Sequence, residues 1–307
     1  MFGEAFSPSG ISSFFEVCTR EKNGTTISDP VKVGARGGGF ALSKGVTTGI
    51  YVEESDVKDI EVFINNSQTW KAKTTETTIE LILRNLEKQY KIKVEHAVEV
   101  PIGAGFGTSA AGAFSCGLAL SHALRLPLTY NQIARIAHMA EVMCNTGLGT
   151  VEGLTIGGLV LVIESGAMGI GLVDRIPIDP NLKIVAGVFK SMDKASVIQS
   201  SETVQKINKI ARKTLKSILH EPTPKNFLRS CKNFALDSGL ASKRVIKLIE
   251  DVEEAGAIGA TQNMIGEAVH ALTTREFLDD VHSVFAKHLP EERIVVSDID
   301  FQGARLR

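Results

Sequence analysis

The segment Pro101–Gly112, which reads Pro-Ile-Gly-Ala-Gly-Phe-Gly-Thr-Ser-Ala-Ala-Gly, has the residue types best suited to chemistry. Gly103, Gly105 and Gly107 let the backbone approach an anion closely, and the helix expected after them directs its positive end to the same place. Ser109 could place its hydroxyl on a magnesium ion bound to that anion. The segment therefore predicts a phosphate-binding loop. The alternative is a tight strand-to-helix connection in an alanine-rich core.

Residue identity excludes two common nucleotide-binding loops and one class of hydrolase. A Walker A loop requires a lysine before its Ser or Thr, and no lysine follows Gly107. A Rossmann fingerprint requires a third glycine where Thr108 stands. Ser109 lacks the G-x-S-x-G context of a serine hydrolase.

A second candidate lies on a helix expected over residues 129–144. His138, Glu141 and Asn145 are spaced i, i+3 and i+7, so they share the face opposite the apolar one. A carboxylate there could hold magnesium beside the phosphate loop, and His138 could bind a substrate oxygen. The alternative, a solvated helix face, is weakened by the glycine-rich stretch 146–158, which predicts another backbone wall nearby.

A third candidate is the segment 255–266, Ala-Gly-Ala-Ile-Gly-Ala-Thr-Gln-Asn-Met-Ile-Gly, which places small residues before an expected helix. It allows close packing or another turn that faces a phosphate, and a plain loop-to-helix junction is the alternative. The histidines other than His138 have no metal-ligand spacing, so we expect them in the core or at the surface.

The elements that must position these segments follow from the hydrophobic pattern, which is interrupted by a glycine turn at 37–39. Capping boxes are expected at Thr77 with Glu80 and at Thr129 with Gln132. The expected strands are 1–17, 45–52, 59–64, 92–100, 159–163, 183–189 and 293–296. The expected helices are 77–90, 109–124, 129–144, 196–219, 224–238, 242–253 and 263–272. The pattern predicts an α+β fold with two domains, residues 1–180 and 181–307.

Composition excludes several other classes of protein. The 307 residues include 34 Lys+Arg and 35 Asp+Glu, a balance that argues against a nucleic-acid binder. No apolar stretch is long enough to span a bilayer, and the N-terminus lacks the regions of a signal peptide. The four scattered cysteines include no C-x-x-C pair, which favours a reducing cytoplasm. We expect a cytoplasmic protein without nucleic-acid or membrane partners.

In this order, the three segments resemble the motifs of the GHMP kinase superfamily. Residues 101–110 fit its second motif, P-x-x-x-G-x-[GS]-[ST]-S-A, and residues 6–15 resemble the A-P-x-H-I-T-G-F-F opening of its archaeal pantoate kinase and pantothenate kinase-like group. Residues 137–141, 146–149 and 264–266 resemble the middle and the C-terminal signature of that group.

The resemblance implies an N-terminal domain like ribosomal protein S5 domain 2, a ferredoxin-like C-terminal domain, and ATP with Mg²⁺ in the cleft. It implies a kinase that phosphorylates the primary hydroxyl of a small pantoyl substrate in coenzyme A biosynthesis, and it leaves a homodimer open. The residues that would bind ATP are Pro101, Gly103, Gly105, Phe106, Gly107, Thr108, Ser109 and Ala110. The catalytic positions would be Ser109, Glu141 and Thr150, the first two as magnesium ligands. The substrate would contact His138, Gly38, Gly39 and Val162.

Three residues depart from the family's pattern. The first is Gly10, which replaces a histidine of the opening motif. Thr150 stands where the family's G-L-G-D has its catalytic Asp, and it cannot accept a proton at neutral pH. Phosphoryl transfer depends mostly on positioning and charge neutralisation, so losing the base need not abolish activity. Glu152 is a candidate replacement.

The third departure is Val162, which stands where the group's G-G-x-x-x-R strand has Arg. An arginine there would suit the carboxylate of pantoate, which has become a neutral amide in pantothenate. A buried arginine beside an amide would cost free energy, so Val162 favours pantothenate as the acceptor, with pantoate as the alternative. A second alternative, motivated by Thr150, is a catalytically impaired GHMP-like protein that only binds ligands.

Overall fold

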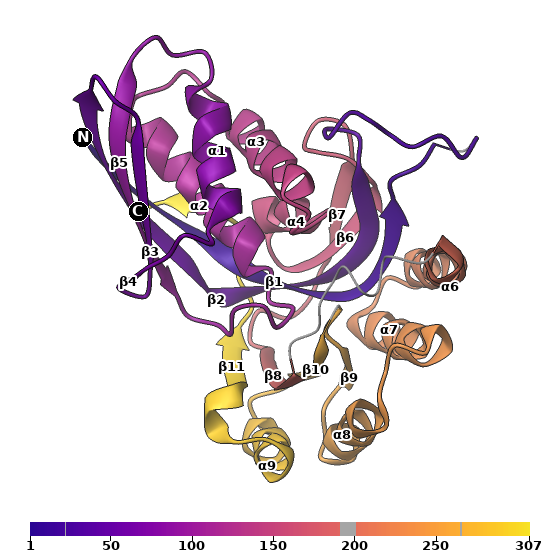
Figure 1. Cartoon of the computed structure of the whole chain (residues 1–307). Coiled ribbons are helices and arrows are strands. Elements are labelled where there is room, and N and C mark those ends of the chain that lie inside the picture. The colour runs from indigo at the N-terminus through magenta and orange to yellow at the C-terminus, as the bar shows by residue number, and fades with distance from the viewer. Residues whose placement is uncertain (22, 191–200, 265) are drawn as a thin grey trace.

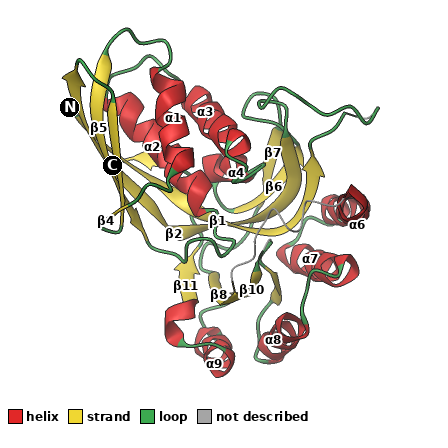
Figure 2. Cartoon of the chain, in the orientation of Figure 1, coloured by secondary structure: helices red, strands yellow, loops and turns green. Residues whose placement is uncertain are grey.

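The computed structural model describes residues 1–307 apart from 22, 191–200 and 265, and these residues form two β-sheets, each with helices on its outer side (Figures 1 and 2). The first sheet contains β1 (Phe2–Cys18), β2 (Gly34–Ser55), β3 (Asp59–Ile64), β4 (Ser67–Gln68), β5 (Gln89–Val98), β6 (Leu159–Glu164), β7 (Leu172–Ile176) and β12 (Arg305–Leu306). Its helices are α1 (Lys73–Leu83), α2 (Thr108–Ala123), α3 (Tyr130–Met143) and α4 (Thr150–Ile156).

The second sheet contains β8 (Lys183–Lys190), β9 (Gly259–Gln262), β10 (Glu267–Thr273) and β11 (Ile294–Asp298). Its helices are α6 (Ser201–His220), α7 (Pro224–Ser238), α8 (Lys243–Glu254) and α9 (Leu278–His288), followed by the short 3₁₀ helix η1 (Glu291–Arg293). The strand order β11-β8-β10-β9 is antiparallel throughout, which is the arrangement of a ferredoxin-like unit. The predicted α+β class is confirmed. Among the described helices, none combines the length and apolar character needed to cross a membrane.

The long antiparallel pair of β1 and β2 organises the first sheet. The C-terminal half of β2 pairs with β5, whereas its residues 37–40 pair with β6. Phe14 and Phe40 of this pair pack edge to face on Phe227 of α7, with ring centroids 6.2 and 5.7 Å away. One hydrophobic core therefore joins the two sheets.

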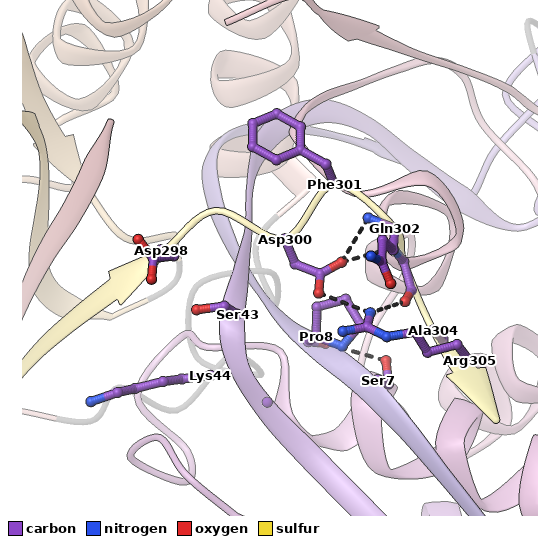
Figure 3. A network of polar contacts seen from close by, with 12 residues as sticks. Ser7, Pro8, Ser43, Lys44, Asp298, Asp300, Phe301, Gln302, Ala304 and Arg305 are labelled. Carbon is purple, nitrogen blue, oxygen red and sulfur yellow. Dashed lines mark hydrogen bonds and ion pairs between the residues drawn. The ribbon is translucent and has the colours of Figure 1, made fainter. Parts of the chain in front are cut away.

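The chain passes from the first sheet to the second between β7 and β8, and β12 returns to pair with β1. The buried carboxylate of Asp300 fixes this return: it accepts the N–H groups of Gln302 and Gly303 at 3.0 and 2.8 Å and pairs with Arg305 at 2.9 Å (Figure 3). The division into domains at residue 180 stays a prediction.

Two of the expected elements are wrong. The glycines at 37–39 lie inside β2 and form no turn, because β1 passes very close: a Cβ on Gly39 would lie 1.7 Å from the carbonyl oxygen of Ile11. Residues 263–272 form no helix, since most of them belong to β10, a short buried run that periodicity alone cannot assign.

Helix α1 begins at Lys73, so Thr77 lies inside it and caps nothing, and the N-cap residue Ala72 has no side-chain bond. Strand β7 and helix α9 were not expected. The first residues of the helix predicted over 196–219 lie outside the described residues, and α6 covers the remainder.

Candidate active site

A cavity of about 520 Å³ opens along β1 and β2. Its wall also includes Val162 of β6, the loop before α4, and Met264 after β9. Glycines and apolar side chains dominate the lining. Of the described residues that line it, Arg36 alone carries a formal charge. The cavity is thus an apolar pocket with one cation on its wall.

The glycine loop expected to bind phosphate connects β5 to α2. Gly103, Gly105 and Gly107 adopt φ values of 74°, 83° and 62°, a conformation that residues with a Cβ rarely adopt. Gly107 is the N-cap of α2, and no side chain of the described residues caps the helix there. The N–H groups of the first turn are therefore open to an anion, which the helix dipole also favours.

One end of the cavity meets this loop. The N–H group of Gly10 donates to the carbonyl oxygen of Phe106 at 3.0 Å, and a Cβ on Gly107 would lie 2.8 Å from Cγ2 of Thr150. Gly10 and Thr150 both line the cavity. Phe106 itself is 1% exposed, so its side chain anchors the loop in the core rather than facing a ligand.

The other predicted ATP-binding residues lie along this loop and at the start of α2. Pro101, Thr108 and Ser109 are partly exposed, whereas Ala110 is buried in the core. The third segment contains β9, and Asn263, which follows that strand, lies beside the same loop, since a Cβ on Gly105 would lie 3.4 Å from Cβ of Asn263. The element that comes after the segment is the strand β10 and not the expected helix.

The two predicted magnesium ligands belong to one chain of oxygen atoms. Ser109 donates to the hydroxyl of Thr74 at 3.1 Å, the hydroxyls of Thr74 and Thr146 lie 3.0 Å apart, and Thr146 donates to Oε1 of Glu141 at 3.1 Å. Mg²⁺ prefers oxygen ligands and often takes one or two carboxylates together with phosphates and water. Ser109 and Glu141 fit such a site. The described residues contain no cluster of three His, Cys, Asp or Glu side chains that could hold a metal without a nucleotide.

His138 lies away from the cavity wall, and its expected contact with the substrate stays a prediction. Its Nδ1 lies 2.7 Å from Oε1 of Glu152 and its Nε2 lies 2.9 Å from the carbonyl oxygen of Val33, so both nitrogens are engaged. His138 and Glu152 are each 1% exposed, and neither lines the cavity. The face that carries them is buried rather than solvated. The side chain of Glu152 faces His138, and its role as a replacement base stays a prediction.

The electrostatics of His138 follow from this pairing. Burial lowers its pKa, but the hydrogen bond and the charge of Glu152 act in the opposite direction and outweigh it. The carbonyl of Val33 and the charge of Glu141 add to the same effect, and the net pKa of His138 is raised. The buried carboxylate thus favours the protonated form of the imidazole.

Gly38, Gly39, Val162 and Thr150, which were predicted at the substrate or catalytic positions, lie on the cavity wall. Their roles stay predictions. Arg36 and Thr74 were not singled out from the sequence. Arg36 stands directly before the glycine run, and a charge next to three glycines is a signal that could have found it. No such signal marks Thr74 within its threonine-rich run.

Comparison with known proteins bears directly on this architecture. Residues 73–152, which span the glycine loop, α2 and α3, match the family model of the GHMP kinases N-terminal domain. Pantoate kinase of Methanocaldococcus jannaschii is 27% identical over 283 residues, 91% of this chain and 96% of that protein. Pantoate kinase of Thermococcus kodakarensis is 28% identical over 278 residues, 90% and 89% of the two chains. Residues 73–152 are thus identified as a GHMP kinase N-terminal domain.

The chain is also similar to a solved structure described as a phosphotransferase related to the CoA biosynthesis pathway. The two share 27% identity and a TM-score of 0.88, with 100% of this chain and 99% of that one covered. The predicted GHMP fold is confirmed, and so is the predicted activity class, an ATP-dependent kinase that acts on a hydroxyl group.

Proposed function

We propose that this kinase transfers the γ-phosphoryl group of ATP to the primary hydroxyl of pantoate. The observation that carries the proposal is the junction at Gly10 and Thr150, where the uncapped glycine loop meets the cavity. The two pantoate kinases that match about nine-tenths of this chain support pantoate as the acceptor. They favour it over pantothenate, the acceptor that Val162 suggested from the sequence.

In the proposed reaction, the N–H groups of the glycine loop and of the first turn of α2 hold the phosphates. The hydroxyl oxygen of the acceptor bonds to the γ-phosphorus as the bond from that phosphorus to ADP breaks. Mg²⁺ held by Ser109 and Glu141 would neutralise charge on the triphosphate. Thr150 cannot accept the hydroxyl proton, so the proton leaves to water, and the rate depends on positioning.

Pantothenate is a second candidate acceptor, favoured by one specific observation. Val162 lies on the cavity wall, opposite Gly37 in the pairing of β6 with β2, and it offers no charge to a carboxylate. A carboxylate next to the pantoyl unit would therefore find no cation at that position. An acceptor whose carboxylate lies farther away does not need one there.

A substrate panel tests the proposal. Purified protein is given ATP, Mg²⁺ and either pantoate or pantothenate, and both ADP release and the phosphorylated product are measured, with Ser109→Ala as the control for contaminating kinases. We expect turnover with pantoate at the higher kcat/KM. A higher kcat/KM with pantothenate would reverse the order of the two candidates. Binding of ATP without turnover of either acceptor would support the catalytically impaired alternative instead.

A further inference from the structure

Arg36 belongs to an ionic cluster whose centre is the buried carboxylate of Glu16. The guanidinium of Arg36 donates to Oε2 of Glu16 through both Nε, at 2.8 Å, and Nη2. Arg212 of α6 donates from its Nε to the other oxygen, Oε1, at 2.7 Å. Glu16 is 4% exposed, so its charge requires partners of this kind. The cluster joins β1, β2 and α6 at one end of the cavity.

The charges of this cluster do not cancel. Two guanidinium groups face one carboxylate, which leaves one net positive charge, and only Arg36 of the three lines the cavity. Arg36 is about one-third exposed. Its Nη1 has no acceptor among the described residues, so two N–H donors remain for a ligand. Glu16 holds the guanidinium in place, which reduces the entropy lost when an anion binds.

Arg36 stands close to position 162, where the family resemblance expects an arginine. Val162 pairs with Gly37, the residue that follows Arg36, so the backbone of Arg36 lies one position along on the neighbouring strand, and Arg36 is itself among the residues that line the cavity. The family resemblance expects an arginine on β6, and this chain carries its cavity cation on β2. A carboxylate in this cavity, away from the glycine loop, meets Arg36 as its one cationic partner among the described lining residues.

The geometry of β2 gives the distance between the glycine-loop end of the cavity and Arg36, which limits the length of an acceptor that contacts both. Ala41, the register partner of Gly10, is five residues from Arg36 along β2, roughly 16 Å at the usual rise of a strand. The triphosphate over the glycine loop takes up part of this length. By ordinary bond lengths, the hydroxyl and the carboxylate are about 5 Å apart in pantoate and about 10 Å apart in extended pantothenate. Whether a carboxylate can reach Arg36 while the hydroxyl lies at the glycine loop therefore depends on the length of the acceptor.

We propose that Arg36, held by Glu16, is the residue that binds the carboxylate of the acceptor. The proposal rests on the proposed function, because it takes the acceptor to be a pantoyl compound that carries a carboxylate. Pantoate and pantothenate share this group. The proposed contact is between the guanidinium of Arg36 and this carboxylate. The two acceptors are tested separately.

The test compares each acceptor with a neutral analogue in the wild type and in Arg36→Met. The analogues are the primary amide of pantoate and, for pantothenate, the alcohol that replaces its carboxylate. Calorimetry with a non-hydrolysable ATP analogue measures binding, and ADP release measures turnover. We expect Arg36→Met to weaken binding of the charged acceptor by about 10- to 100-fold, and of its neutral analogue by less than about threefold. The acceptor arm that shows this loss identifies the natural carboxylate.

Two further variants separate binding from structure. Arg212→Met removes the other arginine of Glu16 but leaves the cavity cation in place, so it should keep the preference for the charged acceptor. Arg36→Lys keeps the charge and should retain part of the preference even if Arg36→Met does not fold.

Equal losses for charged and neutral acceptors in either Arg36 variant would overturn the inference, because they would make Arg36 a structural residue only. Failure of the proposed function has a different signature: the wild type would bind the acceptors, with a preference for the charged one, and transfer no phosphate to either.

Discussion

Nδ1 of His138 lies 2.7 Å from Oε1 of Glu152, and both side chains are 1% exposed. The opposite ring nitrogen contacts the carbonyl oxygen of Val33, which directly precedes β2. This pair ties α3 to α4 and to the start of β2. Because α4 and β2 both line the cavity, the pair sets the shape of the cavity wall without touching its contents.

His138→Gln is therefore expected to reduce stability rather than acceptor binding. Removing one partner of a buried pair costs about 3–5 kcal/mol, so the Tm should fall by several degrees while the KM for the acceptor stays within about threefold. Thermal unfolding and steady-state kinetics measure the two effects. His282→Gln is the matched control, since His282 forms a similar pair with Glu291 at the surface. An unchanged Tm with a tenfold higher KM would instead restore a substrate contact for His138.

Glu141→Gln should lower kcat by about 10²-fold or more, if Glu141 holds the metal that neutralises the transferred phosphoryl group. The amide keeps the shape of the side chain but loses its charge, so the Mg²⁺ concentration required for half-maximal rate should rise. Glu80→Gln, an exposed glutamate paired with Lys58, is the control. A normal Mg²⁺ dependence in Glu141→Gln would mean that the carboxylate does not hold the metal and has a structural role.

Thr150→Asp should raise kcat, because it adds a carboxylate that can accept the hydroxyl proton at the junction of the loop and the cavity. General bases contribute about 10²- to 10⁴-fold in enzymes adapted to them, and we expect a gain of about tenfold in this cavity. Thr150→Asn has the same size without a base and should give no gain. Rates measured across pH distinguish the two variants. Equal rates in both would show that proton removal does not limit this kinase.

Local signals in the sequence were sufficient for several elements that build the site. The capping box of Thr129 and Gln132 is present in the structure, and α7 begins at Pro224 and ends at Ser238 as predicted. The glycine loop lies between a strand and a helix, as its composition indicated. In these places the residues that determine the structure are neighbours in the sequence, so a short stretch of sequence is sufficient to predict it.

Other features depend on partners far away in the chain. Helical spacing puts His138 and Glu141 on one face, but that face is buried because Val33, 105 residues earlier, lies against it. Gly37 and Gly39 are required by the close passage of β1 and Gly38 by that of β6 and α7, which no local pattern reveals. The cluster of Arg36 and Glu16 is completed by Arg212 of α6. None of these three features can be predicted until the tertiary fold is known.

We expect two buried histidines to make the stability of the protein depend on pH in acid. His96 contacts the hydroxyls of Thr48 and Thr75 at 2.8 and 3.0 Å, and His270 contacts Ser13 and Asn263 at 2.9 and 2.5 Å. Burial lowers the pKa of His96 to about 4 and that of His270 to about 3. Both rings are therefore neutral in the folded protein at physiological pH, each within a network of uncharged partners.

Acid should therefore destabilise the protein in a defined pH window. The unfolded chain protonates these histidines near pH 6.5, whereas the folded protein does so only near pH 4 and 3. Their contribution is complete above pH 6.5 and decreases as the pH falls, by about 1.4 kcal/mol per pH unit for each histidine. His138 acts in the opposite direction: its raised pKa stabilises the protein below pH 6.5 and loses this effect as the pH rises.

Urea unfolding at several values between pH 7 and 5 measures this slope of the free energy of unfolding. His96→Gln should reduce the slope of the free energy of unfolding against pH by the contribution of one proton. Substitution of the exposed His220 should leave this slope unchanged. An acid slope that survives unchanged in His96→Gln would show that this ring takes up its proton equally in both states, so that burial does not hold it neutral.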